Sequence, residues 1–95
     1  MNNLSAAKGD SKGEIHLQWD SKENAVSYII EIAKTFNSNN ANNAKEIRWK
    51  VLDIISNSRY TVRNLRSNKE YYFRVAFVNV DGNKEQSRKV AKKAP

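Results

Sequence analysis

The residues that most often carry chemistry in proteins are few in this chain. His16 is the only histidine and cysteine is absent, so a zinc site, which needs about four ligands, is close to excluded. His16 alternates with Ile15 and Leu17, which predicts that its side chain points to solvent from a half-buried strand. No nucleophile, base and orienting group can be assembled around it, and we therefore expect no catalytic residue.

The other groups that could hold an ion or a phosphate are also poorly placed. Asp10, Glu14 and Asp20 lie near one another in the sequence, but a calcium site would need more oxygen ligands in a defined loop. The three glycines are scattered, at Gly9, Gly13 and Gly82. They form no glycine-rich loop that could hold a phosphate. We therefore expect that the chain is no enzyme and binds no metal and no cofactor.

Length and charge limit the class of protein further. The 95 residues suffice for one domain, expected over 1–95 with its core at about 4–91. The net charge is +7 and unevenly spread. Residues 1–44 carry four Lys and five Asp or Glu, which gives a net charge of −1. Residues 45–95 carry thirteen Lys or Arg and five Asp or Glu, which gives a net charge of +8. This asymmetry favours an acidic partner. No apolar run approaches the roughly 20 residues of a membrane-spanning helix, so membrane insertion is not expected.

Alternating apolar and polar residues indicate strands along most of the chain. The clearest runs are Ile15–Asp20, Val26–Ile32, Ile47–Val51, Tyr60–Val62 and Tyr71–Phe77. Turn-forming residues separate these runs, and no window has helical periodicity. The Asn-rich stretch over 37–44 has little to bury and is expected to be a loop. Short strands with turns between them favour an antiparallel sandwich or barrel.

The order of these residues resembles the fibronectin type III family. Trp19 closes the second strand, Tyr28 lies in the alternating third strand, and Trp49 falls where many members carry a tryptophan. The most specific match is Leu65–Val75, where a Leu, a short turn, a Tyr and an alternating strand look like the family's tyrosine corner. The resemblance covers about residues 4–91. The usual prolines near the corner and the integrin-binding Arg-Gly-Asp tripeptide of some members are missing.

The resemblance implies an all-β, immunoglobulin-like sandwich of two antiparallel sheets with about seven strands. It gives Leu65 and Tyr71 a structural role, because the hydroxyl of the corner Tyr bonds back to upstream backbone in this family. The period-two pattern independently places five large side chains in the core: Trp19, Tyr28, Phe73, Val75 and Phe77.

Two surface features are candidates for binding. If Tyr28 and Phe73 face the core, their alternate neighbours form an apolar docking face on the outer side of two adjacent strands. This face comprises Ile29, Tyr72, Ala76 and Val78. A candidate basic surface comprises Arg48, Lys50, Arg63, Arg66, Arg74, Arg88, Lys89, Lys92 and Lys93. The alternative interpretation of both sets is ordinary solvated surface.

The sequence therefore predicts a non-catalytic structural or protein-interaction module. The leading expectation is a small accessory subunit of a larger assembly, such as a phage virion, because the chain begins with Met and has no secretory signal and no cysteine. The alternative is a spacer or binding module excised from a secreted bacterial multidomain enzyme or adhesin. A weaker alternative is an electrostatic binder of nucleic acid or acidic glycan, although no aromatic row for base stacking is present. The first predicts a virion or cytoplasmic location and the second an extracellular one.

Overall fold

The computed structural model describes residues 3–37 and 45–95, in which strands are joined by turns. The strands are β1 (Ser5–Lys8), β2 (Ile15–Gln18), β3 (Ala25–Asn37), β4 (Lys45–Ile55), β5 (Arg59–Val62), β6 (Glu70–Asn79), β7 (Lys84–Gln86) and β8 (Val90–Lys93). All of their pairings are antiparallel. No residue of the described ranges lies in a helix.

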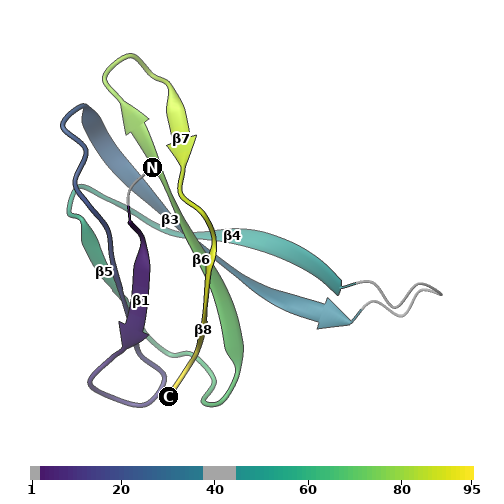
Figure 1. Ribbon diagram of the computed structural model, residues 1–95. Coiled ribbons are helices and arrows are strands. Elements are labelled where there is room, and N and C mark those ends of the chain that lie inside the picture. Colours follow the sequence, from purple (N-terminus) through teal and green to yellow (C-terminus); the bar gives the residue numbers. More distant parts are fainter. Residues whose placement is uncertain (1–2, 38–44) are drawn as a thin grey trace.

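The strands form two sheets that face each other (Figure 1). The smaller sheet has the order β1-β2-β5, and the larger has the order β4-β3-β6-β7, with β8 also paired to β6. β3 and β6 occupy the centre of the larger sheet and pair from Ala25 to Ala33 of β3. The predicted all-β sandwich of two antiparallel sheets is therefore confirmed.

The described residues form eight strands rather than about seven, because the last strand is interrupted at Ser87. The Ser87 hydroxyl accepts a hydrogen bond from the Val75 N–H at 2.9 Å and donates one to the Arg88 carbonyl at 2.9 Å. The Ser87 N–H in turn donates to the Val75 carbonyl at 2.8 Å. A buried side chain thus takes one place in the β6 hydrogen-bond ladder, which separates β7 from β8.

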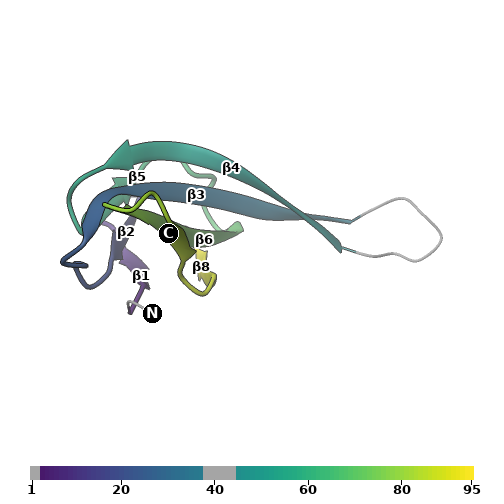
Figure 2. The same cartoon turned by 90° about the horizontal axis from the view of Figure 1, so that it is seen from above.

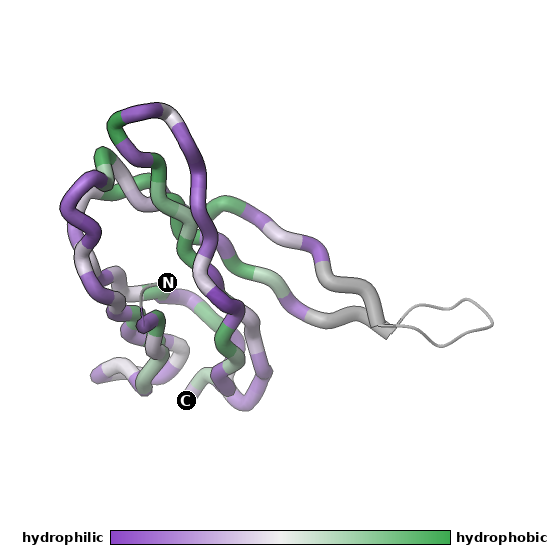
Figure 3. Tube along the Cα trace, turned by 45° about the horizontal axis from the view of Figure 1, so that its top comes forward, coloured by the Kyte–Doolittle hydropathy of each residue, from purple (hydrophilic) through white to green (hydrophobic). Residues whose placement is uncertain are grey.

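The core lies between the sheets and contains the five side chains expected there. Phe73 and Val75 are fully buried, and Trp19, Tyr28 and Phe77 are at most 4% exposed. The Trp19 and Tyr28 rings meet edge to face, with their centroids 5.4 Å apart, a favourable geometry for an aromatic pair. Hydrophobic residues predominate along the central strands, while hydrophilic residues occupy β7 (Figure 3). Period-two alternation therefore identified the buried face correctly.

The β3–β4 hairpin extends beyond the sandwich as an arm. β6 pairs with β3 only as far as Ala33, whereas β4 pairs with β3 from Tyr28 to Asn37. Figures 1 and 2 both show the two strands projecting sideways past the other elements. Asn37, which was expected to begin a loop, is the last residue of β3. The rest of the loop predicted at 37–44 lies outside the described residues.

Gly13 joins the N-terminal turn to the loop that precedes β6. Its φ of 77° lies in the left-handed region, and a Cβ placed on it would lie 2.6 Å from the Leu65 carbonyl oxygen. Its carbonyl accepts a hydrogen bond from the Leu65 N–H at 3.0 Å, and its N–H donates to the Pro95 carbonyl at 3.0 Å. Three distant parts of the chain are therefore held together at one residue that can only be glycine without strain.

Candidate interaction surfaces

The outer face of the larger sheet carries the side chains that were predicted to dock. Ile29, Tyr72 and Val78 are half-buried there, on the side away from the core residues of β3 and β6. Ala76 differs, because it is fully buried. It is a short side chain whose register partners are Ile29 of β3 and Gln86 of β7. The methyl group of Ala76 lies below its larger neighbours and is removed from the docking face.

β4 adds two exposed apolar residues to this face that the sequence did not identify. Val51 is 53% exposed and Ile54 is 60% exposed, and their β3 partners are Glu31 and Ile29. Both face outward although they are three residues apart, because the register shifts there and leaves Leu52 without a partner on β3. Such a β-bulge reverses the alternation of the strand. The sequence signal was the broken alternation after Val51.

Asp53 lies next to this bulge. Its Oδ1 accepts a hydrogen bond from the Ile54 N–H at 2.8 Å. Burial raises the pKa of the Tyr60 hydroxyl, and the charge of the Asp53 carboxylate, which accepts a hydrogen bond from it, raises that pKa further. Tyr60 is therefore a neutral donor at physiological pH, and its hydrogen bond to Asp53 joins β5 to β4 near the bulge.

A largely buried ion pair lies in the middle of the outer face. Two nitrogens of Arg74, Nε and Nη2, donate to the same Glu31 carboxylate oxygen at 3.0 and 2.7 Å. The Glu31 side chain is only 7% exposed and that of Arg74 is 24% exposed. The guanidinium carbon also lies 4.1 Å from the centre of the Trp49 ring, within the range of a cation–π contact. The charge of Arg74 is therefore neutralised inside the face.

The predicted basic residues are distributed over several elements of the fold. Arg74 belongs to the ion pair just described, and Arg63 pairs with Glu14 at 3.3 Å. Lys89 lies 5.3 Å from the centre of the Tyr72 ring on the outer face. Of the remaining residues, Arg48 and Lys50 lie on β4 and Arg66 lies in the β5–β6 loop. Arg88, Lys92 and Lys93 lie in the C-terminal segment.

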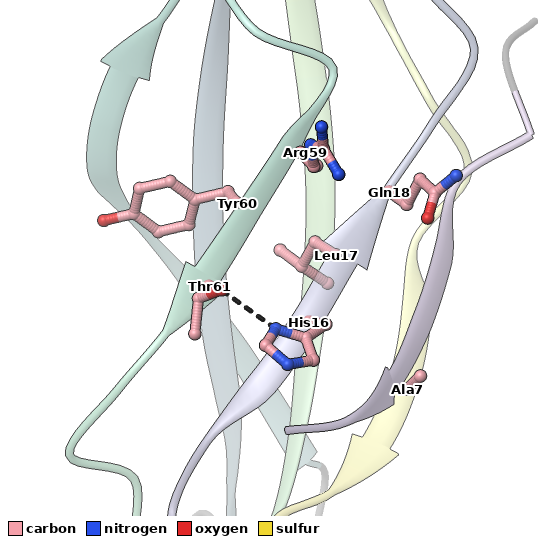
Figure 4. Close-up of a pocket in the computed structure, with 7 residues that line it drawn as sticks. All are labelled: Ala7, His16, Leu17, Gln18, Arg59, Tyr60 and Thr61. Carbon is pink, nitrogen blue, oxygen red and sulfur yellow. Dashed lines mark hydrogen bonds between the residues drawn. The ribbon is translucent and has the colours of Figure 1, made fainter. Parts of the chain in front are cut away.

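His16 lies on the opposite face of the molecule, in a hollow of the smaller sheet with a volume of about 520 Å³. Figure 4 shows His16 beside Thr61, and its Nδ1 is 2.9 Å from the threonine hydroxyl. Asp10 is 3.9 Å from Nε2 and its side chain is 96% exposed, so it does not orient the ring by a hydrogen bond. These three residues therefore lack the chain of hydrogen bonds that activates a nucleophile.

The described residues contain neither a metal-binding cluster nor a membrane-spanning helix. In residues 3–37 and 45–95, no group of three or more His, Asp or Glu side chains is arranged to hold a metal ion. The same part of the chain contains no helix of the length and hydropathy needed to span a membrane.

Tyr71 joins the core to the loop before β6. It is 9% exposed, and its hydroxyl accepts a hydrogen bond from the Arg66 N–H at 3.0 Å. Leu65, the residue before this donor, is half-buried and packs against the core. This is the geometry of a tyrosine corner. Tyr28 makes a similar contact, because its hydroxyl accepts a hydrogen bond from the Lys22 N–H at 2.9 Å.

Replacing Tyr71 with phenylalanine is expected to lower the free energy of unfolding by about 1–3 kcal/mol, because the Arg66 N–H loses its acceptor in a part-buried site. Tyr72→Phe is a matched control on the adjacent residue, whose side chain is half-buried on the outer face. This control should change stability by no more than about 0.5 kcal/mol. Urea unfolding of both variants measures the difference, and equal losses would show that the Tyr71 hydroxyl contributes nothing specific.

Comparison with known proteins places the chain in a family. Residues 2–93 match the model of the fibronectin type III domain, which is almost the whole chain. No curated protein sequence matches with significance. The family's domains are generally non-catalytic structural or binding modules.

Solved structures agree with this fold. An Fn3-like protein from Clostridium thermocellum has a TM-score of 0.71 and 20% identity, over 94% of this chain and 84% of that one. A fourth FNIII domain of human origin has a TM-score of 0.72 and 16% identity, over 97% and 74%. Pectate lyase PelI from Erwinia chrysanthemi, in complex with tetragalacturonic acid, has a TM-score of 0.71 and 11% identity, over 96% of this chain but 28% of that one. The sandwich, the corner at Tyr71 and the match over residues 2–93 agree, and the chain belongs to the fibronectin type III family.

Proposed function

We propose that this domain is a protein-interaction module that docks on a partner protein of a larger assembly through the outer face of its larger sheet. The observation that supports this most directly is the exposure of Val51 and Ile54, at 53% and 60%. Ile54 lies beside half-buried Ile29, its register partner on β3, and Val51 lies beside Glu31 of the ion pair with Arg74. Exposed apolar residues gathered on one face of a sheet are a feature of protein contact sites.

The chemistry of the face favours a folded protein surface as its partner. Its rim carries charge, as at Lys84 of β7 and Lys93 of β8, whose register partners are Val78 and Glu70. A polar rim around exposed apolar residues is common in protein interfaces. The Glu31–Arg74 pair at its centre is stacked on Trp49. Aromatic residues and arginine are the residues that most often dominate binding energy at such centres.

The leading form of this proposal is a small accessory subunit of an assembly such as a phage virion, in the virion or the cytoplasm. The alternative is an extracellular binding or spacer module within a longer secreted protein. The similarity to pectate lyase PelI supports the alternative, because the matching part is only 28% of that chain. Mass spectrometry of intact proteins from the source separates the two: the 10.9 kDa chain in purified particles supports the subunit, and its detection only within a longer polypeptide supports the module.

The docking face is tested with charge introduced at its most exposed positions. Val51→Glu combined with Ile54→Glu is expected to weaken partner capture at least about tenfold, because carboxylates would be buried in an apolar contact. The matched control is Ala7→Glu with Gln18→Glu, which places the same charges at exposed positions of the smaller sheet. Capture from source lysate by wild type, variant and control is compared by mass spectrometry, after unfolding curves establish equal stability. A partner retained equally by all three proteins would overturn the proposal.

A further inference from the structure

The turn between β6 and β7 (Figure 1) places an aspartate directly before a glycine. Asp81 and Gly82 are both exposed. Gly82 has a φ of 83°, and nothing lies within 4 Å of the place where its Cβ would be. The absence of a side chain on Gly82 leaves the peptide bond between the two residues accessible on that side.

An aspartate before a glycine can react with its own backbone. The glycine nitrogen attacks the carboxyl carbon of the aspartate side chain, a C–N bond forms, and the carboxyl OH leaves with the amide hydrogen as water. Water then opens the resulting succinimide ring at one of its two carbonyl carbons. One opening restores aspartate, and the other leaves isoaspartate, whose main chain is longer by one methylene. Because the attack is intramolecular, its rate depends on how often the two atoms approach each other.

The closed turn restrains the attacking nitrogen. The Gly82 N–H donates a hydrogen bond to the Asn79 carbonyl at 2.9 Å, and the Asn79 N–H donates to the Asn83 carbonyl at 3.0 Å. The Asn79 side chain adds two more bonds, because its Oδ1 accepts from the Asp81 N–H and from the Asn83 N–H, both at 3.0 Å. These hydrogen bonds fix the backbone on both sides of the reactive peptide bond.

Asn79 takes part in all of these bonds, and its side chain makes two of them. The hydrogen that must leave the Gly82 nitrogen is held in one of them, so the nitrogen is free to attack only while the turn is open. Local opening is an equilibrium whose population depends on the bonds that close the segment. The Asn79 side chain therefore limits how often the reaction can begin.

We propose that Asp81 is a site of spontaneous isomerisation, and that the Asn79 side chain slows this modification by keeping the turn closed. The added methylene of isoaspartate would lengthen the connection between Val78 and Lys84, which are register partners of β6 and β7. The pairing of β7 with β6 is then expected to loosen. This inference concerns the β6–β7 turn and does not depend on a partner at the outer face.

The test incubates the whole domain for several weeks in water enriched in heavy oxygen. Each opening of the succinimide puts one heavy oxygen atom into residue 81, whether aspartate or isoaspartate results, and fragmentation mass spectrometry locates and counts that atom. Asn79→Ala is expected to raise the rate of incorporation at least about tenfold, because the turn loses two hydrogen bonds. Asn83→Ala is the matched control in the same turn and should change the rate less than about threefold, since only backbone atoms of Asn83 make these bonds.

Two further variants separate the chemistry from a loss of stability. Asn79→Asp keeps an acceptor oxygen on the side chain and should hold the rate within about threefold of wild type. Asp81→Glu keeps the charge and the turn, but its longer side chain would have to close a six-membered ring. Incorporation at this position should therefore fall at least about tenfold in Asp81→Glu. Urea unfolding establishes that all variants are folded before incubation.

Three results would overturn the proposal. No incorporation at residue 81 in Asn79→Ala, or undiminished incorporation in Asp81→Glu, would show that no succinimide forms there. Equal rates in Asn79→Ala and Asn83→Ala would show that the Asn79 side chain does not restrain the turn. An equal acceleration in Tyr71→Phe, which lowers stability away from this turn, would show that the reaction follows global unfolding instead of local opening.

Discussion

Replacing Gly13 with alanine is expected to lower the free energy of unfolding by about 3 kcal/mol. The φ of 77° costs an L-residue roughly 1–2 kcal/mol by itself. The added Cβ would also lie 2.6 Å from the Leu65 carbonyl oxygen, so backbone must move. That movement strains the hydrogen bonds that Gly13 makes with Leu65 and Pro95. Urea unfolding at 25 °C measures the loss as a lower midpoint at an unchanged m-value.

Gly82→Ala is the matched control for this substitution. Gly82 has nearly the same dihedral angle, a φ of 83°, but a Cβ placed on it meets nothing within 4 Å. The control therefore isolates the backbone conformation and should cost about 1 kcal/mol. If the two substitutions cost the same, the close approach of Gly13 to Leu65 contributes no stability.

Arg74→Met is expected to cost about 2–4 kcal/mol, because it leaves the Glu31 carboxylate unpaired in a site where its side chain is 7% exposed. Methionine keeps part of the contact with Trp49. The loss of stability therefore measures chiefly the cost of leaving the Glu31 carboxylate without its partner. Removing both charges with Glu31→Gln and Arg74→Met should recover most of the stability, since replacing a whole buried pair is often neutral.

Arg88→Met controls for the loss of one positive charge. Arg88 is exposed, and this substitution should change the free energy of unfolding by no more than about 0.5 kcal/mol. Unfolding curves of wild type, Glu31→Gln, Arg74→Met and the double variant complete a double-mutant cycle, and Arg88→Met is measured beside them as the control. Equal stability of Arg74→Met and Arg88→Met would show that solvent screens the pair and that it does not organise the outer face.

The sequence predicted what depends on one strand at a time. Trp19, Tyr28 and Phe73 were placed in the core from alternation within their own runs, and all three are buried. The tyrosine at position 71 was identified from its distance to Leu65 along the chain. Core positions of this kind depend on spacing within one strand, because alternate side chains of a regular strand point to opposite faces of the sheet.

What the sequence did not predict depends on register between strands. The exposure of Ile54 results from a bulge opposite Ile30 and Glu31, and the burial of Ala76 results from its partners on β3 and β7. Arg74 was placed on the basic surface because its pairing with Glu31, 43 residues away, is invisible in a local pattern. The break at Ser87 likewise depends on a side chain that replaces a backbone bond.

The continuity of β3 also determines how the domain would respond to mechanical force. β3 runs without interruption from the centre of the larger sheet into the arm, and its pairing with β6 spans Ala25–Ala33. Antiparallel hydrogen bonds lie across the strand direction. A pull on the arm along β3 would therefore shear that whole set of bonds together instead of unzipping them one by one. Tension on the arm would be carried through β3 to residues of the hydrophobic core, such as Tyr28 and Ile30.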